Sequence, residues 1–262
     1  MSLKKIRLSC ILISLGSLFL FSQITLAQSS SKNPSMPTLH ILCSTALKST
    51  MEALVPSLEQ EGHMNIQISF NSTNLLLDSF KNGSAADVII VTKEAIDDLI
   101  KQNTLLVPRV DIASTSVGLA MKTGTPTIVL KDAQALKEFL IQSESIAYTT
   151  TGVSGQYIGQ MIDKLGLKQT LASKTKLIPG GLAAELIVSG QAQVALQNLS
   201  ELRAVPGTVV IATLPPELQL VTTFSSGTFA SSKQTALAQK FSQMMQGDHA
   251  KKVLITKGLD PQ

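Results

Sequence analysis

The strongest constraint on the fold is a regular alternation of short apolar runs with segments whose apolar residues recur at helical spacing. Between Leu39 and Ile100 this strand-then-helix order occurs three times, with strands expected at 39–43, 66–70 and 87–91. Such alternation predicts a parallel sheet covered by helices. The strand at 87–91 is almost wholly apolar, which is typical of a strand buried on both faces.

A second alternation of the same kind follows residue 126. Between the two series lie a strand at 116–121 and the turn-rich connection Lys122–Pro126, which we interpret as a crossing point. A strand at 218–223 leads back to the first series, and two helices end the chain. The pattern predicts an α/β protein of two lobes, each a mostly parallel sheet covered by helices, with the ligand cleft between them. Within the second series we expect helices at 132–142 and 156–165 and strands at 145–148, 175–178, 193–197 and 208–211.

The first 27 residues have the order of a secretory signal peptide. Three basic residues precede an apolar run at 8–21, and a stretch ending in Ala27 follows. The run is shorter than the ~20 residues that a membrane-spanning helix needs. We therefore expect cleavage after Ala27 and export to the periplasm.

The domain boundaries follow from these patterns. Residues 1–27 are the signal peptide, and residues 28–37 form a polar, proline-broken leader that we expect to be flexible. Residues 38–121 and 220–262 are assigned to the first lobe and residues 122–219 to the second. The first lobe is thus built from both ends of the mature chain.

Composition argues against several classes of function. The formal net charge of +4 falls to about +1 without residues 1–27, which carry three basic residues and no acid, so we expect no nucleic-acid partner. Of the two cysteines only Cys43 remains, which precludes an intramolecular disulfide, and its place at the end of an apolar strand predicts a buried structural residue. The three histidines lack metal-ligand spacing, so we expect no metal or cofactor.

Small polar residues and glycines dominate five strand-to-helix loops. Ligands of parallel α/β sheets bind beyond the carboxyl ends of the strands, where helix N-termini point free N–H groups outward. Neutral donors and helix dipoles can hold an oxyanion or a carboxylate without lysine or arginine. The same residue types also serve as ordinary N-caps and turns, so the functional interpretation depends on all five loops meeting at one edge. The loops are residues 43–46, 71–74, 149–155, 179–181 and 197–200.

Several short segments also stand in a characteristic order: Leu42–Leu47, Phe70–Thr73, Gly83–Val88, Val153–Tyr157 and Gly190–Ala192. In order and spacing they resemble the periplasmic molybdate-binding-protein-like substrate-binding proteins of ABC transporters. The likeness spans nearly all of residues 39–259. It implies the type II periplasmic binding fold, in which two lobes close on a small anionic solute over two crossover strands. It also implies a monomer that docks on an ABC-transporter permease in the inner membrane.

The same resemblance implies ligand contacts on the loops. The first-loop serine aligns best with an alanine, so neighbouring hydroxyls are expected to replace it. Asn198 stands where the family usually has a capping tyrosine, which leaves molybdate specificity open. The implied ligand-binding residues are Ser44, Thr45, Ala46, Ser72, Thr73, Ser154, Gly155, Gly180 and Asn198.

A divergent branch of that family offers an alternative function. Residues 145–148, 179–181 and 197–207 resemble aconitate isomerase, a secreted enzyme that shifts a proton across a tricarboxylate. An isomerase needs a general acid and base near the reacting carbon. The candidates are Cys43, Lys48, Tyr157 and Glu185, while Arg203 is a further candidate for holding a carboxylate. Because no candidate is marked as activated, we favour binding of a molybdate-like oxyanion or small carboxylate over catalysis.

Overall fold

The computed structural model describes residues 35–262. The predicted signal peptide and most of the predicted leader lie outside these residues. Within the described part, the chain forms the α/β architecture that the alternation predicted, with two sheets linked by long strands. No helix between residues 35 and 262 combines the length and apolar character needed to cross a bilayer.

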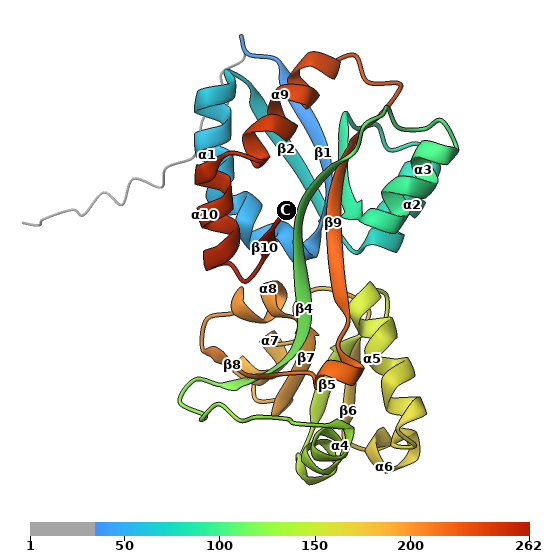
Figure 1. Ribbon diagram of the computed structural model, residues 1–262, viewed down its shortest axis with the longest axis vertical. Helices are drawn as coiled ribbons and strands as arrows, with labels where there is room; N and C mark the ends of the chain where they lie inside the picture. The colour runs from blue at the N-terminus through green and yellow to red at the C-terminus, as the bar shows by residue number, and fades with distance from the viewer. Residues whose placement is uncertain (1–34) are drawn as a thin grey trace, which may run out of the picture. The chain divides into compact units, whose positions relative to one another are not determined.

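The first sheet contains strands from both ends of the described chain (Figure 1). Its strands follow the order β2-β1-β3-β9-β4, with β10 beside β4. The three strands of the first alternation pair in parallel, whereas the others are antiparallel to their neighbours. The strands are β1 (Thr38–Ser44), β2 (Asn65–Asn71), β3 (Val88–Thr92), β4 (Val110–Lys122), β9 (Val221–Thr228) and β10 (Asp260–Pro261).

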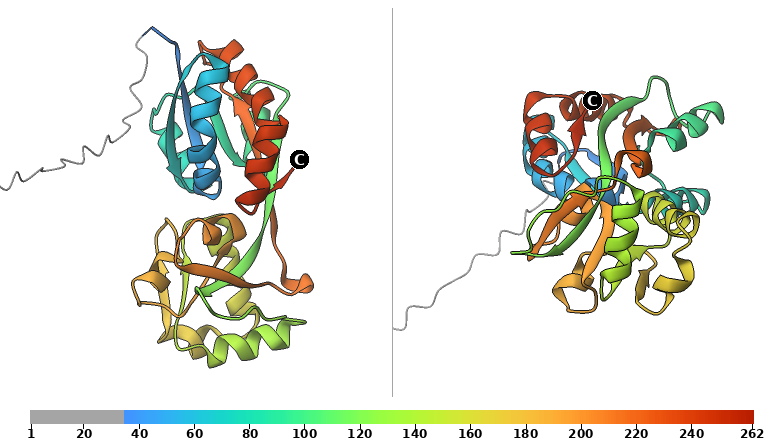
Figure 2. Two further views of the ribbon diagram at one scale, coloured as in Figure 1. Left: turned by 90° about the vertical axis from the view of Figure 1, so that its left-hand side faces the viewer. Right: turned by 60° about the horizontal axis from the view of Figure 1, so that its bottom comes forward.

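Helices cover both faces of this sheet. Met51 packs with Ile90 on one face, and Ile96 packs with Ile89 on the other. Successive strand residues point to opposite faces, so the apolar run in β3 is buried on both sides. The helices α1 and α10 lie side by side (Figure 2). The helices are α1 (Lys48–Gly62), α2 (Thr73–Lys81), α3 (Lys93–Lys101), α9 (Thr235–Met245) and α10 (Asp248–Thr256).

The second sheet joins the remaining strands to the far half of β4. The strands β6, β5 and β7 pair in parallel, while β7 and β8 are antiparallel to β4. Two apolar clusters, one containing Leu136 and Ile158 and the other Ile187 and Leu202, pack against it. Its elements are α4 (Ala133–Gln142), β5 (Ile146–Thr149), α5 (Val153–Lys164), α6 (Lys168–Ala172), β6 (Thr175–Ile178), α7 (Glu185–Val188), β7 (Val194–Asn198), α8 (Leu199–Arg203) and β8 (Thr208–Thr213).

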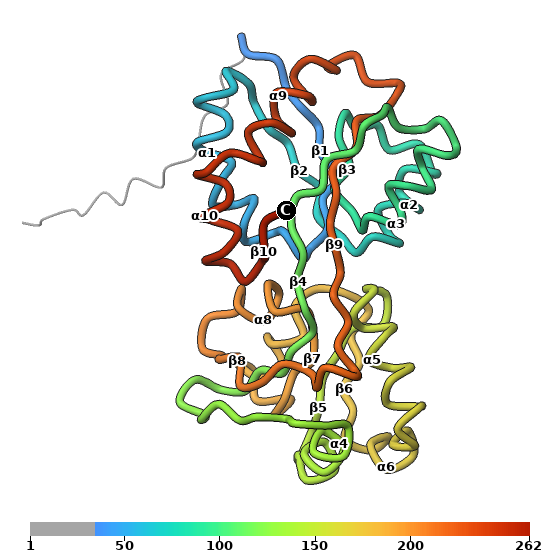
Figure 3. Tube along the Cα trace, viewed as in Figure 1, coloured from blue at the N-terminus to red at the C-terminus, as the bar shows by residue number. Residues whose placement is uncertain are grey.

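The crossing between the sheets lies inside β4 rather than in the connection Lys122–Pro126. Up to Ser116 this strand pairs with β9, and from Val117 it pairs with β7. The strand runs without a break through Gly118, which pairs with Gln197 of β7 and Thr213 of β8. The chain returns along β9 (Figure 3). The boundaries predicted between the lobes, after residue 121 and after residue 219, stay a prediction.

Three local features differ from the sequence prediction. The return strand was expected at 218–223, but β9 begins at Val221 and continues to Thr228, because its Ser-Ser-Gly end is buried between β3 and β4. The 3-10 helix η2 (Pro216–Leu218) precedes it. The short helix α6 and strand β10 were not predicted, since each is too short for a periodic pattern.

Helix α5 begins three residues earlier than predicted, at Val153. Gly155 lies in its first turn, and a Cβ atom there would stand 1.9 Å from the carbonyl oxygen of Thr149. The glycine therefore lets the helix start close against the end of β5. A side chain at this position would force the two backbones apart.

We expect Gly155→Ala to lower the free energy of unfolding by about 1–3 kcal/mol, the usual cost of overpacking. Gly159→Ala in the same helix is the matched control, because its Cβ would meet only the Tyr148 ring at 3.8 Å. Urea unfolding of both variants measures the difference. Equal stability of the two variants would contradict this role of Gly155.

Candidate functional site

A polar cleft lies where the carboxyl ends of six parallel strands come together. The strands β1, β2 and β3 contribute from the first sheet, and β5, β6 and β7 from the second. The space enclosed is about 400 Å³, including the part that is continuous with solvent. Its lining residues are Ser44, Thr45, Ser72, Thr73, Thr92, Thr149, Gly152, Val153, Ser154, Gly180, Gly181, Gln197, Asn198, Glu201 and Phe224.

Seven of the nine residues proposed from the sequence lie in this cleft. They come from loops widely separated in the chain, and the fold brings them together because parallel strands end at the same edge of a sheet. Their contact with a ligand stays a prediction. The seven are Ser44, Thr45, Ser72, Thr73, Ser154, Gly180 and Asn198.

The other two proposed residues, Ala46 and Gly155, are not among the lining residues. Ala46 is buried in the core of the first sheet, where it belongs to the cluster around Leu47. Gly155 is buried against Thr149, as described above. In both cases a lining residue next to the proposed one, Thr45 or Ser154, faces the cleft instead.

Five helices or helix-like turns begin at the cleft. Ser72, Thr92, Gly152 and Asn198 are the N-cap residues of α2, α3, α5 and α8, and none of them caps its helix with a side-chain hydrogen bond. Ser44 is different, because its hydroxyl accepts a hydrogen bond from the Ala46 N–H at 3.4 Å. Uncapped helix N-termini carry a partial positive charge and free N–H donors, which favour an anion.

Buried polar atoms at the cleft also lack partners. Ser72 Oγ and Asn198 Oδ1 have no hydrogen-bond partner within residues 35–262. Buried polar groups in proteins are nearly always hydrogen-bonded, so unpaired ones at a cleft point to a bound molecule as their partner. One bond already links the two sides: Asn74 Nδ2 donates to the Thr151 carbonyl oxygen at 3.4 Å.

Glu201 is the ionisable residue of the cleft that the sequence analysis missed. It is 7% exposed, and its Oε2 atom has no partner in the described part of the chain. Burial raises the pKa of Glu201 to about 7, against the opposing effect of hydrogen bonds from Asn198 and Gln197. Its position three residues after the N-cap Asn198 of α8 is that of a capping-box glutamate, and this spacing is the signal that could have identified it.

Thr92 was missed for a different reason, and Gln197 lies in the predicted loop 197–200 although it was not named as a ligand-binding residue. Thr92 ends β3, so the same strand-end rule would have found it had the loop after the third strand been included. The Gln197 side chain accepts from the Ala183 N–H at 2.8 Å and donates to the Gly181 carbonyl oxygen at 2.9 Å. It therefore fixes the loop that carries Gly180.

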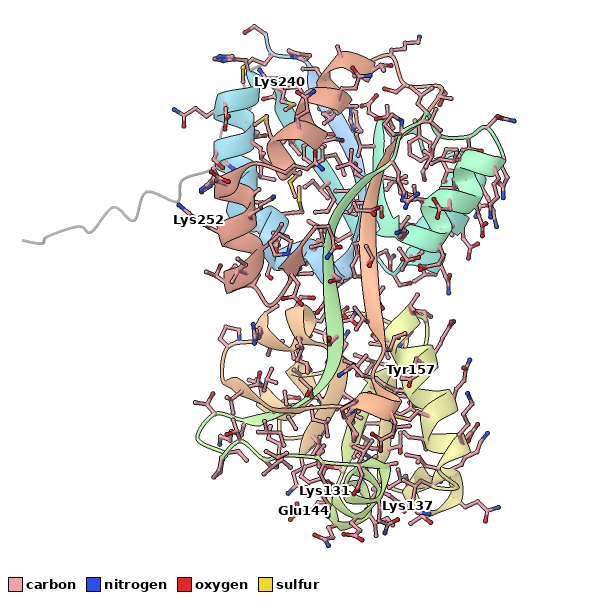
Figure 4. All side chains as sticks on the ribbon, viewed as in Figure 1. Lys131, Lys137, Glu144, Tyr157, Lys240 and Lys252 are labelled. Atoms are coloured by element: carbon pink, nitrogen blue, oxygen red, sulfur yellow. The ribbon has the colours of Figure 1, made fainter. Side chains whose placement is uncertain are left out.

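The four acid-base candidates proposed from the sequence lie outside the cleft lining. Burial raises the pKa of the Cys43 thiol well above its usual range, and the predicted structural role of this buried cysteine is confirmed. Tyr157 donates its hydroxyl hydrogen to the Leu218 carbonyl oxygen at 2.7 Å (Figure 4). Glu185 is exposed on α7, and Lys48 pairs with Glu52 at 3.8 Å.

The positively charged side chains of residues 35–262 also lie outside the cleft lining. The exposed Arg203 side chain lies next to Gly258 and not in the cleft. Within the structure as described, no cleft-lining residue is a lysine, arginine or histidine. Over the same residues, no group of three or more His, Cys, Asp or Glu side chains is placed to share a metal ion. An anion in the cleft would thus be held by neutral donors and helix N-termini.

Comparison with known proteins identifies related sequences and folds. The family model described as bacterial extracellular solute-binding protein matches residues 39–260. An aconitate isomerase from Pseudomonas sp is 25% identical over 256 residues, which cover 95% of each chain.

Two solved structures share the fold. The periplasmic molybdate-binding protein of Azotobacter vinelandii superposes with a TM-score of 0.68 and 19% identity, over 84% of this chain and 98% of that one. The tungstate-binding protein of Desulfovibrio alaskensis gives a TM-score of 0.60 and 13% identity, over 86% and 99% of the two chains. Both support the two-lobed periplasmic binding fold.

The buried carboxyl group of Glu201 makes the free energy of unfolding depend on pH. The folded state holds the Glu201 proton more tightly than the unfolded chain does. The contribution of the protonated carboxyl group to the free energy of unfolding is therefore fully present below pH 4.5 and is lost as the pH rises through about 7. Relative to Glu201→Gln, the native protein should lose about 2–3 kcal/mol of unfolding free energy between pH 5 and pH 8.

Urea unfolding at several pH values measures this difference. Glu185→Gln, which alters an exposed glutamate, should differ from the native protein by a constant amount across the range. A constant difference for Glu201→Gln as well would show that Glu201 titrates normally.

Proposed function

Because the chain belongs to the bacterial extracellular solute-binding protein family, we propose that it captures a small anion in the periplasm for import by an ABC transporter. The anion is a molybdate-like oxyanion or a small carboxylate, and the partner is the transporter's permease in the inner membrane. The observation that carries this proposal is the convergence of six strand ends on one cleft lined by hydroxyl, amide and helix N-terminal donors. The family and the predicted signal peptide support the periplasmic location.

The proposed ligand contacts are made by the loop residues that line the cleft. Thr73 and Ser154 stand in the first turns of α2 and α5, where a hydroxyl and the helix N–H groups can bind the same oxygen. Ser44, Thr45 and Ser72 supply further hydroxyls, and Gly180 supplies a backbone N–H. Hydrogen bonds to a charged acceptor are the strong ones, so such contacts hold an anion without a counter-ion.

Closure of two lobes around the anion would bring these donors together. We assign residues 38–121 and 220–262 to one lobe and residues 122–219 to the other. The hinge would lie in β4 and β9, which connect the two sheets. The hydrogen bond from Asn74 to Thr151 would help to hold the closed form. Closure gives the ligand-bound protein a different shape from the empty protein, and a permease can distinguish the two.

A second candidate function is the isomerisation of aconitate. It is favoured by the likeness to aconitate isomerase along 95% of both chains and by Glu201, whose pKa of about 7 suits proton transfer. A binding protein needs only the donors, whereas an isomerase also needs a group that moves a proton. We put binding first because the matching family model describes solute-binding proteins and because binding needs only the donors that line the cleft.

A thermal-shift screen of residues 28–262 tests the ligand class directly. The anions are molybdate, tungstate, sulfate, trans-aconitate, citrate and succinate. A ligand present at ~100 times its dissociation constant should stabilise the native protein by ~2.7 kcal/mol. No shift with any of these anions would contradict anion binding.

We expect Thr73→Ala and Ser154→Ala each to weaken binding of the anion found in that screen by about tenfold or more, because each removes a hydrogen bond to a charged group worth ~1.5–3 kcal/mol. The melting temperature of the empty protein should hardly change. Calorimetric titration measures the affinities. Ser189→Ala, which removes an exposed hydroxyl at the C-cap of α7, is the matched control. Unaltered affinity in both variants would remove these two loops from the site.

Incubation with trans-aconitate separates the two functions. A solute-binding protein should return the compound unchanged, whereas an isomerase should form cis-aconitate until equilibrium. Chromatography of the products over hours measures this. Turnover that is lost in Glu201→Gln would place the isomerase first.

A further inference from the structure

We propose that Glu201 is a ligand-binding residue of the cleft and that it must be protonated for an anion to bind. When the Glu201 carboxyl group of the empty protein is ionised, binding of an anion is then accompanied by the uptake of one proton. The inference rests on the proposed function and adds a specificity-determining residue to it.

The geometry places the Glu201 side chain in the wall of the cleft. Glu201 lines the same cleft as Ser44, Thr73 and Ser154, and it is 7% exposed. Asn198 and Gln197 lower the pKa of the carboxyl group against the effect of burial, and Oε2 has no hydrogen-bond partner among the residues described. One carboxyl oxygen is therefore available to a molecule in the cleft.

The charge of the site decides which form of Glu201 can meet an anion. No lysine, arginine or histidine is among the described lining residues, so no cationic side chain there offsets a carboxylate. Two like charges about 4 Å apart at an effective dielectric constant of about 20 cost roughly a thousandfold in affinity. The neutral carboxyl avoids this repulsion and supplies an O–H donor that an ionised group lacks. A carboxylic O–H donating to an anionic oxygen makes a short, strong hydrogen bond.

The surroundings allow this proton to be held near neutral pH. Burial raises the pKa of Glu201 to about 7, with Asn198 and Gln197 acting in the opposite direction. No charged neighbour contributes to that value. Helix α8 packs against β4, β7, β8, α1 and the 3-10 helix η1 (Thr45–Leu47). The titratable residues of these elements are Asp111 and Lys122 on β4 and Lys48, Glu52, Glu59 and Glu61 on α1.

The proposal predicts a pH-dependent affinity. Molybdate and trans-aconitate serve as probes, because both are fully ionised from pH 6 to pH 8.5. With native protein, the dissociation constant of the probe that binds should rise at least tenfold over this range, since the protonated fraction of Glu201 falls about tenfold per pH unit above its pKa. In Glu201→Gln, whose amide is neutral at every pH, the affinity should vary less than twofold.

Calorimetry in two buffers of different ionisation enthalpy gives an independent readout on the native protein. At pH 8 it should detect uptake of nearly one proton per anion bound. Glu185→Gln, which changes an exposed glutamate outside the cleft, should keep the native pH dependence. A melting transition for each variant shows that it is folded.

The outcomes separate this inference from the proposed function. Tight binding that does not change with pH, or without proton uptake, would overturn the role of Glu201 and leave anion binding intact. Loss of binding at pH 6 in a folded Glu201→Gln would also overturn it, because the carboxylate and not the neutral group would then be required. Failure of the native protein to bind either probe at any pH would overturn the proposed function, and the inference with it.

Discussion

The parallel pairing of two sets of three strands is the constraint on which the cleft depends. Because β2-β1-β3 and β6-β5-β7 are each parallel, their carboxyl ends meet at one edge of each sheet. Each strand is followed by a turn or helix whose first N–H groups have no partner within the helix. The antiparallel strands β4 and β9 join the sheets without adding competing loops to these edges. The donors of the cleft are thus a consequence of topology before any side chain is considered.

The side chains then determine what such donors can hold. Hydroxyls and amides at Thr73, Ser154 and Asn198 extend the donor set without adding charge. A lysine or arginine would strengthen attraction to any anion, whereas neutral donors in fixed positions select by geometry and by the number of acceptor oxygens. The single carboxyl group, Glu201, is the exception, and burial raises its pKa to about 7. Protonation of this one residue would therefore change the charge of the cleft.

The sequence predicted the architecture and most of the candidate site because both follow from short-range patterns. The apolar strand at 87–91 and the loop Asn71–Asn74 each carry their signal locally. The crossing inside β4 was missed because a strand that changes sheets has no turn residue to mark it. Ala46 and Gly155, proposed together with their neighbours, lie outside the cleft lining, since a shift of one residue on a helix turns a side chain from the cleft to the core. The capping-box spacing of Glu201 marks a helix start in the sequence, whereas its burial at the cleft is visible only in the structure.

Glu201 also shows how a binding site and an active site can share one scaffold. As the third residue of α8 it belongs to the capping arrangement with Asn198, which fixes one side of the carboxyl group. The other oxygen, Oε2, is buried without a partner among the described residues, at a cleft whose remaining lining groups are neutral. A carboxyl that holds its proton there can stabilise a bound anion, and one that releases it can accept a proton from a bound acid. The difference between capture and isomerisation then lies in how close a reactive carbon comes to this oxygen, which the loops after β2 and β5 control.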